Sequence, residues 1–189
     1  RPAGYLGELG RRLDPAVLVY WTGEEVCSRA IDRAHLERVA RELGRPVCLW
    51  DNYPVNDGAR MSRFLHLRAF TGRSAAIAPH VSGHAINPAI QAHLGCIPAL
   101  TLAAAYRQGE AYAYGAAFAE AARQVLGAAF AQMLQQDLPA LQDVGHERLG
   151  SRGERLRARY ASIDHPAARE ILRWLDGDDL MTDDEVQTQ

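Results

Sequence analysis

The chain has 189 residues, of which 48% are hydrophobic and 23% are charged, and its net charge is -2. This length allows one buried core with room for an appendage. The small net charge gives no indication of a nucleic-acid or membrane-surface partner. The three cysteines are an odd number and show no CxxC spacing, so neither a disulfide framework nor a zinc knuckle is indicated. No apolar run approaches the roughly 18 residues of a membrane span.

The first half of the chain predicts a strand–helix–strand unit. Strands are expected at about residues 16–21 and 46–51, because both runs are short, apolar and rich in β-branched and aromatic residues. Residues 32–43 carry apolar side chains at helical spacing, with Asp32 placed to cap this helix and Gly44 to end it. A helical connection makes the two strands parallel, and the strand composition predicts that both are buried on both faces.

A long irregular stretch follows the second strand. Residues 51–82 are interrupted by proline and glycine and predict a long loop, and long loops in compact domains are usually functional. A third strand is expected at residues 83–86. Asn87 and Pro88 end it and predict a helix start, with Asn87 as the cap and Pro88 at the first helical position.

The second half of the chain predicts mostly helix. Helical segments are expected at residues 89–95, 97–107, 114–141 and 166–175. Pro98 separates the first two because it lacks a backbone N–H, and residues 145–153 are expected to form a linker. The chain is acidic from Asp176 on, and we expect a frayed or disordered end. Its adjacent aspartates at 178–179 and 183–184 are predicted to be solvated.

Polar side chains follow each of the three expected strands. They are Thr22 after the first strand, Asp51, Asn52 and Asp57 after the second, and Asn87 after the third. Binding sites of parallel α/β folds lie at the carboxyl ends of the strands, so these groups should converge on one mouth. The alternative is that the amides and Asp57 only cap turns and helices.

Trp50 stands at the end of the second strand, beside these polar groups. An indole face packs well on a pyranose ring while neighbouring carboxylates and amides bind hydroxyls, which favours a sugar as ligand. The alternative is that Trp50 only packs in the core.

Other chemistry finds little support in the sequence. Asp51 and Asp57 could be the carboxylate pair of a glycosidase, but they lie six apart in one loop, and nothing in the sequence indicates a raised pKa for either. His80 and His84 are four apart, but the neighbouring proline and glycine argue against a helical metal site. The sequence therefore predicts neither a metal nor a cofactor.

Four segments occur in an order that matches a known family. They are Trp21-Thr22-Gly23 with Val26 and Ser28, LWDNYPVND (49–57), LHLRAFTGR (65–73) and GHAINPAIQA (83–92). Together they resemble glycoside hydrolase family 84, which contains the O-GlcNAcases and related bacterial β-N-acetylglucosaminidases, some of them described as hyaluronidases. The resemblance covers about residues 16–125.

The resemblance implies the fold. Members have a (β/α)8 barrel followed by a helical domain, so we expect an α/β chain that holds the C-terminal part of a TIM-type barrel in residues 1–112. Residues 113–189 are expected to be a helical segment. Three strands cannot close a barrel, so the N-terminal half of the barrel should lie upstream.

The resemblance also implies the reaction. Family members are retaining enzymes in which the 2-acetamido oxygen of the substrate attacks the anomeric carbon and forms an oxazoline. One of two adjacent aspartates orients the acetamido group, and the other is general acid and then base. These aspartates belong to an earlier strand than any in this chain, so no catalytic residue is expected here.

Residues that hold the sugar are expected in this chain. The resemblance assigns six positions to sugar binding: Trp50, Asn52, Asp57, Asn87, Thr22 and Val26. Trp50 resembles the tryptophan that walls the acetamido pocket, and Asn52 resembles an asparagine that lines the site. Asp57 and Asn87 resemble a pair that binds the sugar hydroxyls far from the scissile bond, and the last two positions match the pocket edge.

Two departures from the family pattern lie in loops. Several members carry Gly-Pro where this chain has Arg68-Ala69, and an aromatic residue often stands where it has Gly58. They put aglycone and peptide contacts in question more than the sugar pocket. The expected partner is an N-acetylglucosamine-containing glycan or glycoprotein. Two alternatives stay open, a non-catalytic carbohydrate-binding or scaffold remnant and a hyaluronan-cleaving enzyme, and so do compartment and oligomeric state.

Overall fold

The computed structural model describes residues 4–182, which fall into two compact units. The first unit comprises the residues up to Asn52, Phe70–Asn87 and Leu102–Tyr112, and the second comprises Tyr53–Ala69, Pro88–Thr101 and the residues from Ala113 on. The division at residues 112 and 113 that the sequence indicates stays a prediction.

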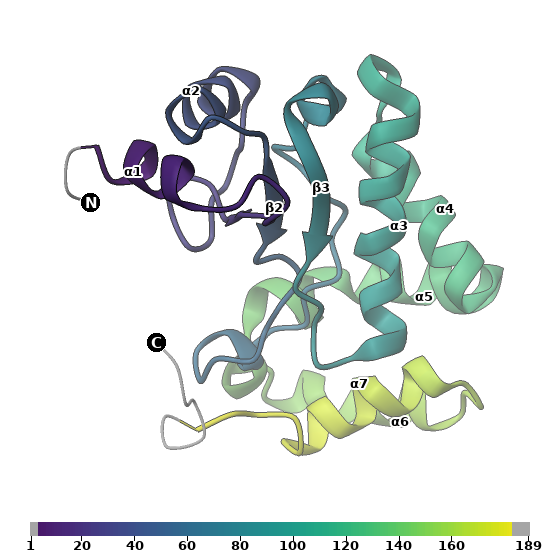
Figure 1. The fold of residues 1–189 in the computed structure, drawn as a ribbon. Coiled ribbons are helices and arrows are strands. Elements are labelled where there is room, and N and C mark those ends of the chain that lie inside the picture. Colours follow the sequence, from purple (N-terminus) through teal and green to yellow (C-terminus); the bar gives the residue numbers. More distant parts are fainter. Residues whose placement is uncertain (1–3, 183–189) are drawn as a thin grey trace. The chain divides into compact units, whose positions relative to one another are not determined.

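A parallel sheet forms the centre of the first unit. Its strands are β1 (Tyr20–Trp21), β2 (Val47–Asp51) and β3 (Val81–Ile86), in the order β1-β2-β3. Both pairings are parallel, with Leu49 beside Trp21 in β1 and beside His84 in β3. Figure 1 shows the arrows of β2 and β3 side by side and pointing the same way. The prediction of three parallel strands is confirmed, and the third strand is longer than expected.

The first strand differs from its prediction. Only Tyr20–Trp21 is strand, at the edge of the sheet in the described part of the chain. Val17 and Leu18 are 43% and 62% exposed, so this apolar run is not buried on both faces. Arg45 holds the preceding segment by donating to the backbone oxygens of Asp14 and Val17, at 2.6 and 3.2 Å.

Helices α1 (Tyr5–Arg12) and α2 (Arg33–Leu43) belong to the same unit, and α2 agrees with its prediction. The Asp32 carboxylate accepts a hydrogen bond from the backbone N–H of His35, and Gly44 ends the helix in the left-handed region with φ of 75°. Both helices share one core with the sheet, made by Leu6, Ile31, Leu36, Val39, Leu43, Val47, Leu49 and Ile77.

Two expectations around the third strand were wrong. Asn87 does not cap a helix, because α3 (Ala92–Gln108) begins five residues later. Its backbone N–H instead donates to the backbone oxygen of Asp51 at 2.9 Å. Pro98 does not divide the helical region either, because α3 continues through it. A proline removes one helical hydrogen bond, and here the helix tolerates that loss.

The second unit is built around helices. They are α4 (Tyr114–Leu126), α5 (Ala128–Pro139), the π-helical turn η4 (Ala140–Val144) and α6 (Ser151–Ala161) with α7 (Pro166–Asp176). Short 3-10 turns occur in this unit at η1 (Met61–Arg63) and η5 (His146–Arg148), and in the first unit at η2 (Ala75–His80) and η3 (Gly109–Ala111). The large core of the second unit includes Phe118, Leu134, Tyr160, Ile171 and Trp174.

Three predictions for this half need correction. The helix expected over 114–141 is interrupted at Gly127, whose φ of 78° breaks it into α4 and α5. The expected linker at 145–153 contains η5 and the start of α6. The aspartate at 179 is buried rather than solvated.

The end of the chain is described only in part. The expected helix at 166–175 is confirmed as α7, whose first turn is capped by the His165 side chain. The predicted solvated pair at 183–184 lies outside the described residues. None of the helices between residues 4 and 182 is long and apolar enough to span a bilayer.

The packing of α1 on α2 generates a prediction. A Cβ on Gly10 would lie 1.9 Å from the backbone oxygen of Leu43, whereas a Cβ on Gly7 comes no closer than 3.5 Å to any neighbour. Gly10→Ala should therefore lower the free energy of unfolding by about 1–3 kcal/mol through overpacking. Gly7→Ala in the same helix should raise it by about 0.5–1 kcal/mol, since alanine favours helix. Urea denaturation measures both, and equal effects of the two would contradict this packing.

Candidate functional site

The carboxyl ends of β2 and β3 bring two predicted residues together. Asn52 follows β2 and Asn87 follows β3, and the Nδ2 of Asn87 donates to the Oδ1 of Asn52 at 3.1 Å. The pairing of the Asn87 N–H with Asp51 continues the parallel register past the end of β3. The predicted convergence of Asn52 and Asn87 at one edge of the sheet is confirmed.

The Asn52 side chain joins three parts of this edge. Its Oδ1 also accepts from the indole Nε1 of Trp50 at 3.1 Å, and its Nδ2 donates to the backbone oxygen of Val26 at 2.8 Å. Trp50 is 37% exposed and packs edge-on against Tyr20, with ring centroids 5.5 Å apart. Simple core packing of Trp50 is therefore wrong, because this ring keeps an open surface beside amide groups.

The segment that carries Val26 is a tight turn. Ser28 Oγ donates to the Glu25 oxygen at 3.1 Å and accepts from the Glu25 N–H at 3.0 Å. Gly23 adopts φ of 99°, and a Cβ there would lie 2.2 Å from Ser28 Oγ, so the turn requires glycine. Val26 itself is 72% exposed.

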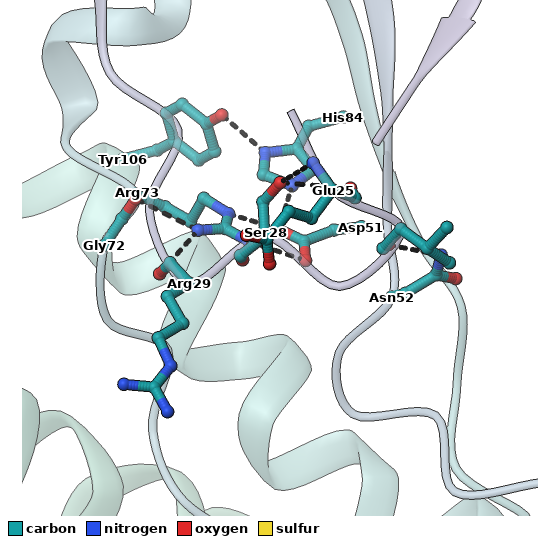
Figure 2. Close-up of polar contacts among 10 residues, drawn as sticks. Glu25, Ser28, Arg29, Asp51, Asn52, Gly72, Arg73, His84 and Tyr106 are labelled. Atoms are coloured by element: carbon teal, nitrogen blue, oxygen red, sulfur yellow. Dashed lines mark hydrogen bonds and ion pairs between the residues drawn. The ribbon is translucent and has the colours of Figure 1, made fainter. Parts of the chain in front are cut away.

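A buried ion pair lies beneath this edge of the sheet (Figure 2). The Arg73 guanidinium donates from Nε and Nη2 to the two oxygens of the Asp51 carboxylate, and both side chains are at most 4% exposed. The same guanidinium donates to the backbone oxygens of Ser28 at 2.7 Å and Arg29 at 3.1 Å. Arg73 thus binds the end of β2 to the turn that carries Val26.

His84 and Tyr106 extend this network. The imidazole Nε2 of His84 lies 3.1 Å from the Asp51 carboxylate, and its Nδ1 lies 2.6 Å from the Tyr106 hydroxyl. A carboxylate can only accept a hydrogen bond, so we place a proton on the Nε2 atom of His84. Burial and then the Asp51 charge raise the pKa of Tyr106 to about 12, so its phenol stays protonated.

The same contacts decide the state of Asp51. Burial alone would raise the pKa of its carboxyl, but hydrogen bonds from His84 and Arg73, with the Arg73 charge, hold that pKa below its ordinary value. An ionised, buried and paired carboxylate is not a general acid. Sequence reasoning placed Arg73 in a family segment without a role and missed Tyr106, because no local pattern links residues so far apart.

The other two predicted positions are less closely tied to this cluster. Thr22 is partly buried and lies in the first unit, directly after β1. Asp57 is exposed and belongs to the second unit, in the loop after β2. The structure therefore gathers Trp50, Asn52, Asn87 and the Val26 backbone, and the binding roles of all six stay predictions.

The histidines that were considered for metal binding serve other contacts. His80 lies 3.6 Å from the Glu37 carboxylate, whereas His84 belongs to the Asp51 network. Within residues 4–182 no group of three or more histidine, cysteine and acidic side chains is arranged to hold a metal ion.

Comparisons with known proteins point in one direction. A family model described as beta-N-acetylglucosaminidase matches residues 1–142, which is 142 of 189 residues. The protein O-GlcNAcases of Rattus norvegicus and Mus musculus are each 32% identical to this chain over 103 residues. The match covers 54% of this chain but only 11% of each of these relatives.

A solved structure agrees with these relatives. A mutant O-GlcNAc hydrolase from Thermobaculum terrenum superposes with a TM-score of 0.72 and 27% sequence identity. The superposition covers 92% of this chain and 44% of that protein. The chain thus spans less than half of the solved relative and about a tenth of the curated ones.

The buried ion pair yields a stability prediction. Arg73→Met leaves the Asp51 carboxylate buried without its cation, which should cost about 3–5 kcal/mol of unfolding free energy at pH 7. Arg29→Met is the matched control, because the Arg29 guanidinium is exposed and points away from the network (Figure 2). Urea denaturation of both variants measures the difference.

The cost of Arg73→Met should depend on pH with a defined sign. The folded pKa of Asp51 is depressed, so the stability from its carboxylate is present above the unfolded value of about 3.9 and is lost as pH falls through the folded pKa. Protonation relieves the unpaired charge in the variant, so the gap between variant and wild type should narrow as pH falls from 7 toward 4. A constant gap would contradict the ion-pair account.

Proposed function

Because this chain belongs to the β-N-acetylglucosaminidase family, glycoside hydrolase family 84, we propose that it forms the sugar-binding part of an O-GlcNAcase-like enzyme. The observation that carries the proposal is the Asn52 side chain, which holds Trp50, Asn87 and the Val26 turn together at the carboxyl ends of parallel strands. An exposed indole beside oriented amides is suited to a pyranose ring with its hydroxyl and acetamido groups.

Each side chain has a distinct proposed role. Trp50 walls the acetamido pocket with its ring, and Asn52 fixes the orientation of that ring through the indole N–H. Asn87 uses its Nδ2 on Asn52, which leaves its Oδ1 to accept from a sugar hydroxyl. Val26 and Thr22 form the edge of the pocket. Asp57 binds the hydroxyls far from the scissile bond, a role that rests on the WDNYPVND motif.

The proposed reaction retains the anomeric configuration. The 2-acetamido oxygen attacks the anomeric carbon, the leaving oxygen receives a proton from a general acid, and water then opens the oxazoline. An adjacent aspartate pair outside these 189 residues supplies the acid and orients the acetamido group. The state of Asp51 supports this division, since a buried carboxylate paired with Arg73 is poorly suited to proton transfer.

The proposed fold of the whole is a (β/α)8 barrel with a helical segment after it. The parallel order β1-β2-β3 and the helical connection α2 support the assignment of this sheet to the last strands of such a barrel. In that fold, polar groups at the carboxyl ends of the strands form the active-site mouth, which is where Asn52 and Asn87 lie in the sheet.

Activity of the intact protein tests the proposed function. The intact protein should hydrolyse an aryl N-acetyl-β-glucosaminide with retention of configuration and should not depolymerise hyaluronan. The 189-residue chain alone should hydrolyse neither, because the proposed acid lies outside it. Turnover by the 189-residue chain that Asp51→Asn abolishes would contradict the assignment of the acid. Sugar binding by the intact protein without hydrolysis would instead favour a carbohydrate-binding role.

Asp57→Ala tests the proposed clamp on the distal hydroxyls. Charge-assisted hydrogen bonds are lost, at a cost on the order of 2–4 kcal/mol, so kcat/KM of the intact enzyme should fall roughly 30- to 1000-fold. The pH profile should keep its shape, since Asp57 transfers no proton. Asn87→Ala should behave alike and be less than additive with Asp57→Ala.

The control for Asp57→Ala is the exposed Asp178, whose change to alanine should leave kcat/KM unaltered. A loss below about twofold for Asp57→Ala, or the disappearance of one limb of the pH profile, would rule out the clamp role.

A further inference from the structure

The loop that carries Asp57 is held by a buried side chain next to it. Asn56 is fully buried, and its Nδ2 donates to the Phe64 backbone oxygen at 3.1 Å. Its Oδ1 accepts from the backbone N–H of Ile90 at 2.9 Å. All these residues belong to the second unit, and they fix the backbone one residue before Asp57.

Asn56 is connected to the end of the described chain by a line of buried polar groups. Its Nδ2 also donates to the Oε1 of Gln91 at 2.9 Å, and the Nε2 of Gln91 donates to the Asp179 carboxylate at 2.9 Å. Gln91 is 2% exposed and Asp179 is 7% exposed. Asp179 also accepts from the Arg173 guanidinium at 2.8 Å. The Asn56–Gln91–Asp179 relay therefore joins the Asp57 loop to the turn that follows α7.

A second contact joins the same two segments. Ser62 is fully buried; its backbone oxygen accepts from the Trp174 indole at 2.9 Å, and its Oγ accepts from the Met181 N–H at 3.0 Å. The Ser62 N–H in turn donates to the Gly58 oxygen at 2.8 Å, directly after Asp57. The loop is thus fixed on both sides of Asp57, through Asn56 before it and through Gly58 and Ser62 after it. Both sets of hydrogen bonds connect the loop to residues that follow Arg173.

The directions of the hydrogen bonds in the relay are fixed from both ends, by the Asp179 carboxylate at one end and by the backbone groups that bind Asn56 at the other. A carboxylate only accepts, so Gln91 must turn its amide nitrogen toward Asp179 and its oxygen toward Asn56. The Asn56 amide is oriented independently, because its nitrogen donates to the Phe64 backbone oxygen and its oxygen accepts from the Ile90 N–H. The Asp179 carboxylate uses one oxygen for Gln91 and the other for Arg173, whereas an asparagine there would offer a single acceptor oxygen and would turn its NH2 group toward one of these two donors.

We propose that Asp179 is a positioning residue for sugar binding, which acts through Gln91 and Asn56 on the loop that carries Asp57. The inference rests on the proposed role of Asp57 and adds a part of the chain that the family motifs do not contain. Asp179 accepts from Gln91, which holds Asn56 and so keeps the backbone next to Asp57 in place. This matters because small displacements of a substrate-binding group lower rates strongly. The alternative is that Asp179 only stabilises the end of α7 through Arg173.

The test compares Asp179→Asn with Asp178→Asn in the intact enzyme. The two substitutions are identical and adjacent, but Asp178 is exposed and lies outside the relay. Asp179→Asn should lower kcat/KM on an aryl N-acetyl-β-glucosaminide by roughly 5- to 50-fold, and Asp178→Asn should leave it within about twofold. Gln91→Met, which breaks the relay at its centre and keeps the side-chain volume, should act like Asp179→Asn.

Substrates that lack a distal hydroxyl separate positioning from stability. The 4-deoxy and 6-deoxy forms of the aryl glycoside probe the hydroxyls farthest from the anomeric carbon. If Asp179 positions Asp57, Asp179→Asn should reduce the preference for the parent glycoside over at least one deoxy form by about fivefold or more. It should also be less than additive with Asp57→Ala. A lower Tm with an unchanged preference would overturn the inference and leave only the stabilising role.

The outcomes also separate this inference from the proposed function beneath it. An effect of Asp57→Ala with none of Asp179→Asn and Gln91→Met overturns the relay alone. No effect of Asp57→Ala, in an enzyme that is otherwise active, overturns the clamp role and the relay together. If Asp179→Asn lowers kcat/KM equally on the parent and on both deoxy glycosides, the relay is also overturned, because the substitution would then act elsewhere in the site.

Discussion

The ion pair between Asp51 and Arg73 is the interaction on which the candidate site depends. Burying a carboxylate at the end of a strand costs free energy unless a cation pairs with it. Arg73 supplies that cation through a bidentate contact with Asp51. The remaining donors of the same guanidinium bind backbone oxygens of the 23–29 turn and of Gly72. One buried cation therefore fixes the distance between the end of β2 and the turn whose Val26 oxygen meets Asn52. Loss of this pair should disturb a surface that the pair itself does not reach.

In the second unit, the side-chain amides of Asn56 and Gln91 help to fix the loop that carries Asp57. The Asp57 loop has no regular secondary structure apart from η1, so its backbone groups need partners from elsewhere. The side chains of Asn56, Ser62 and Trp174 supply several of them, and Gln91 links Asn56 to the Asp179 carboxylate. Buried polar networks of this kind specify one arrangement only when every member is satisfied. Both units thus use a buried carboxylate to hold exposed residues that the family resemblance connects with sugar binding.

The sequence predicts local features well where one physical rule dominates. Helix α2 is amphipathic and has a clear cap and a terminating glycine, so its bounds agree with the structure. The parallel strands and the meeting of Asn52 with Asn87 follow from the helical connection and the strand-end rule. The WDNYPVND motif gave the family, but its aspartate at 51 serves the ion pair rather than proton transfer.

The remaining features depend on contacts between distant residues. The composition of residues 16–21 is that of a buried strand, yet Val17 and Leu18 are exposed. Burial depends on which residues pack against the strand, and the local sequence does not specify them. Asn87 and Pro88 have the residue types of a helix start, but pairing with β2 keeps this segment extended. Asp179 follows a helix in an acidic stretch, and only its contacts with Gln91 and Arg173 distinguish it from its exposed neighbour.

The central claim is that the surface formed by Trp50, Asn52 and Asn87 binds the sugar. A crystal structure of the intact protein with N-acetylglucosamine tests this most directly. The account predicts a pyranose whose acetamido group lies against the Trp50 ring and whose hydroxyl donates to the Oδ1 of Asn87, with the Asn52 bonds to Trp50 and Asn87 retained. A sugar bound away from these three side chains, or one that contacts the Asp51 carboxylate in place of Arg73, would contradict it.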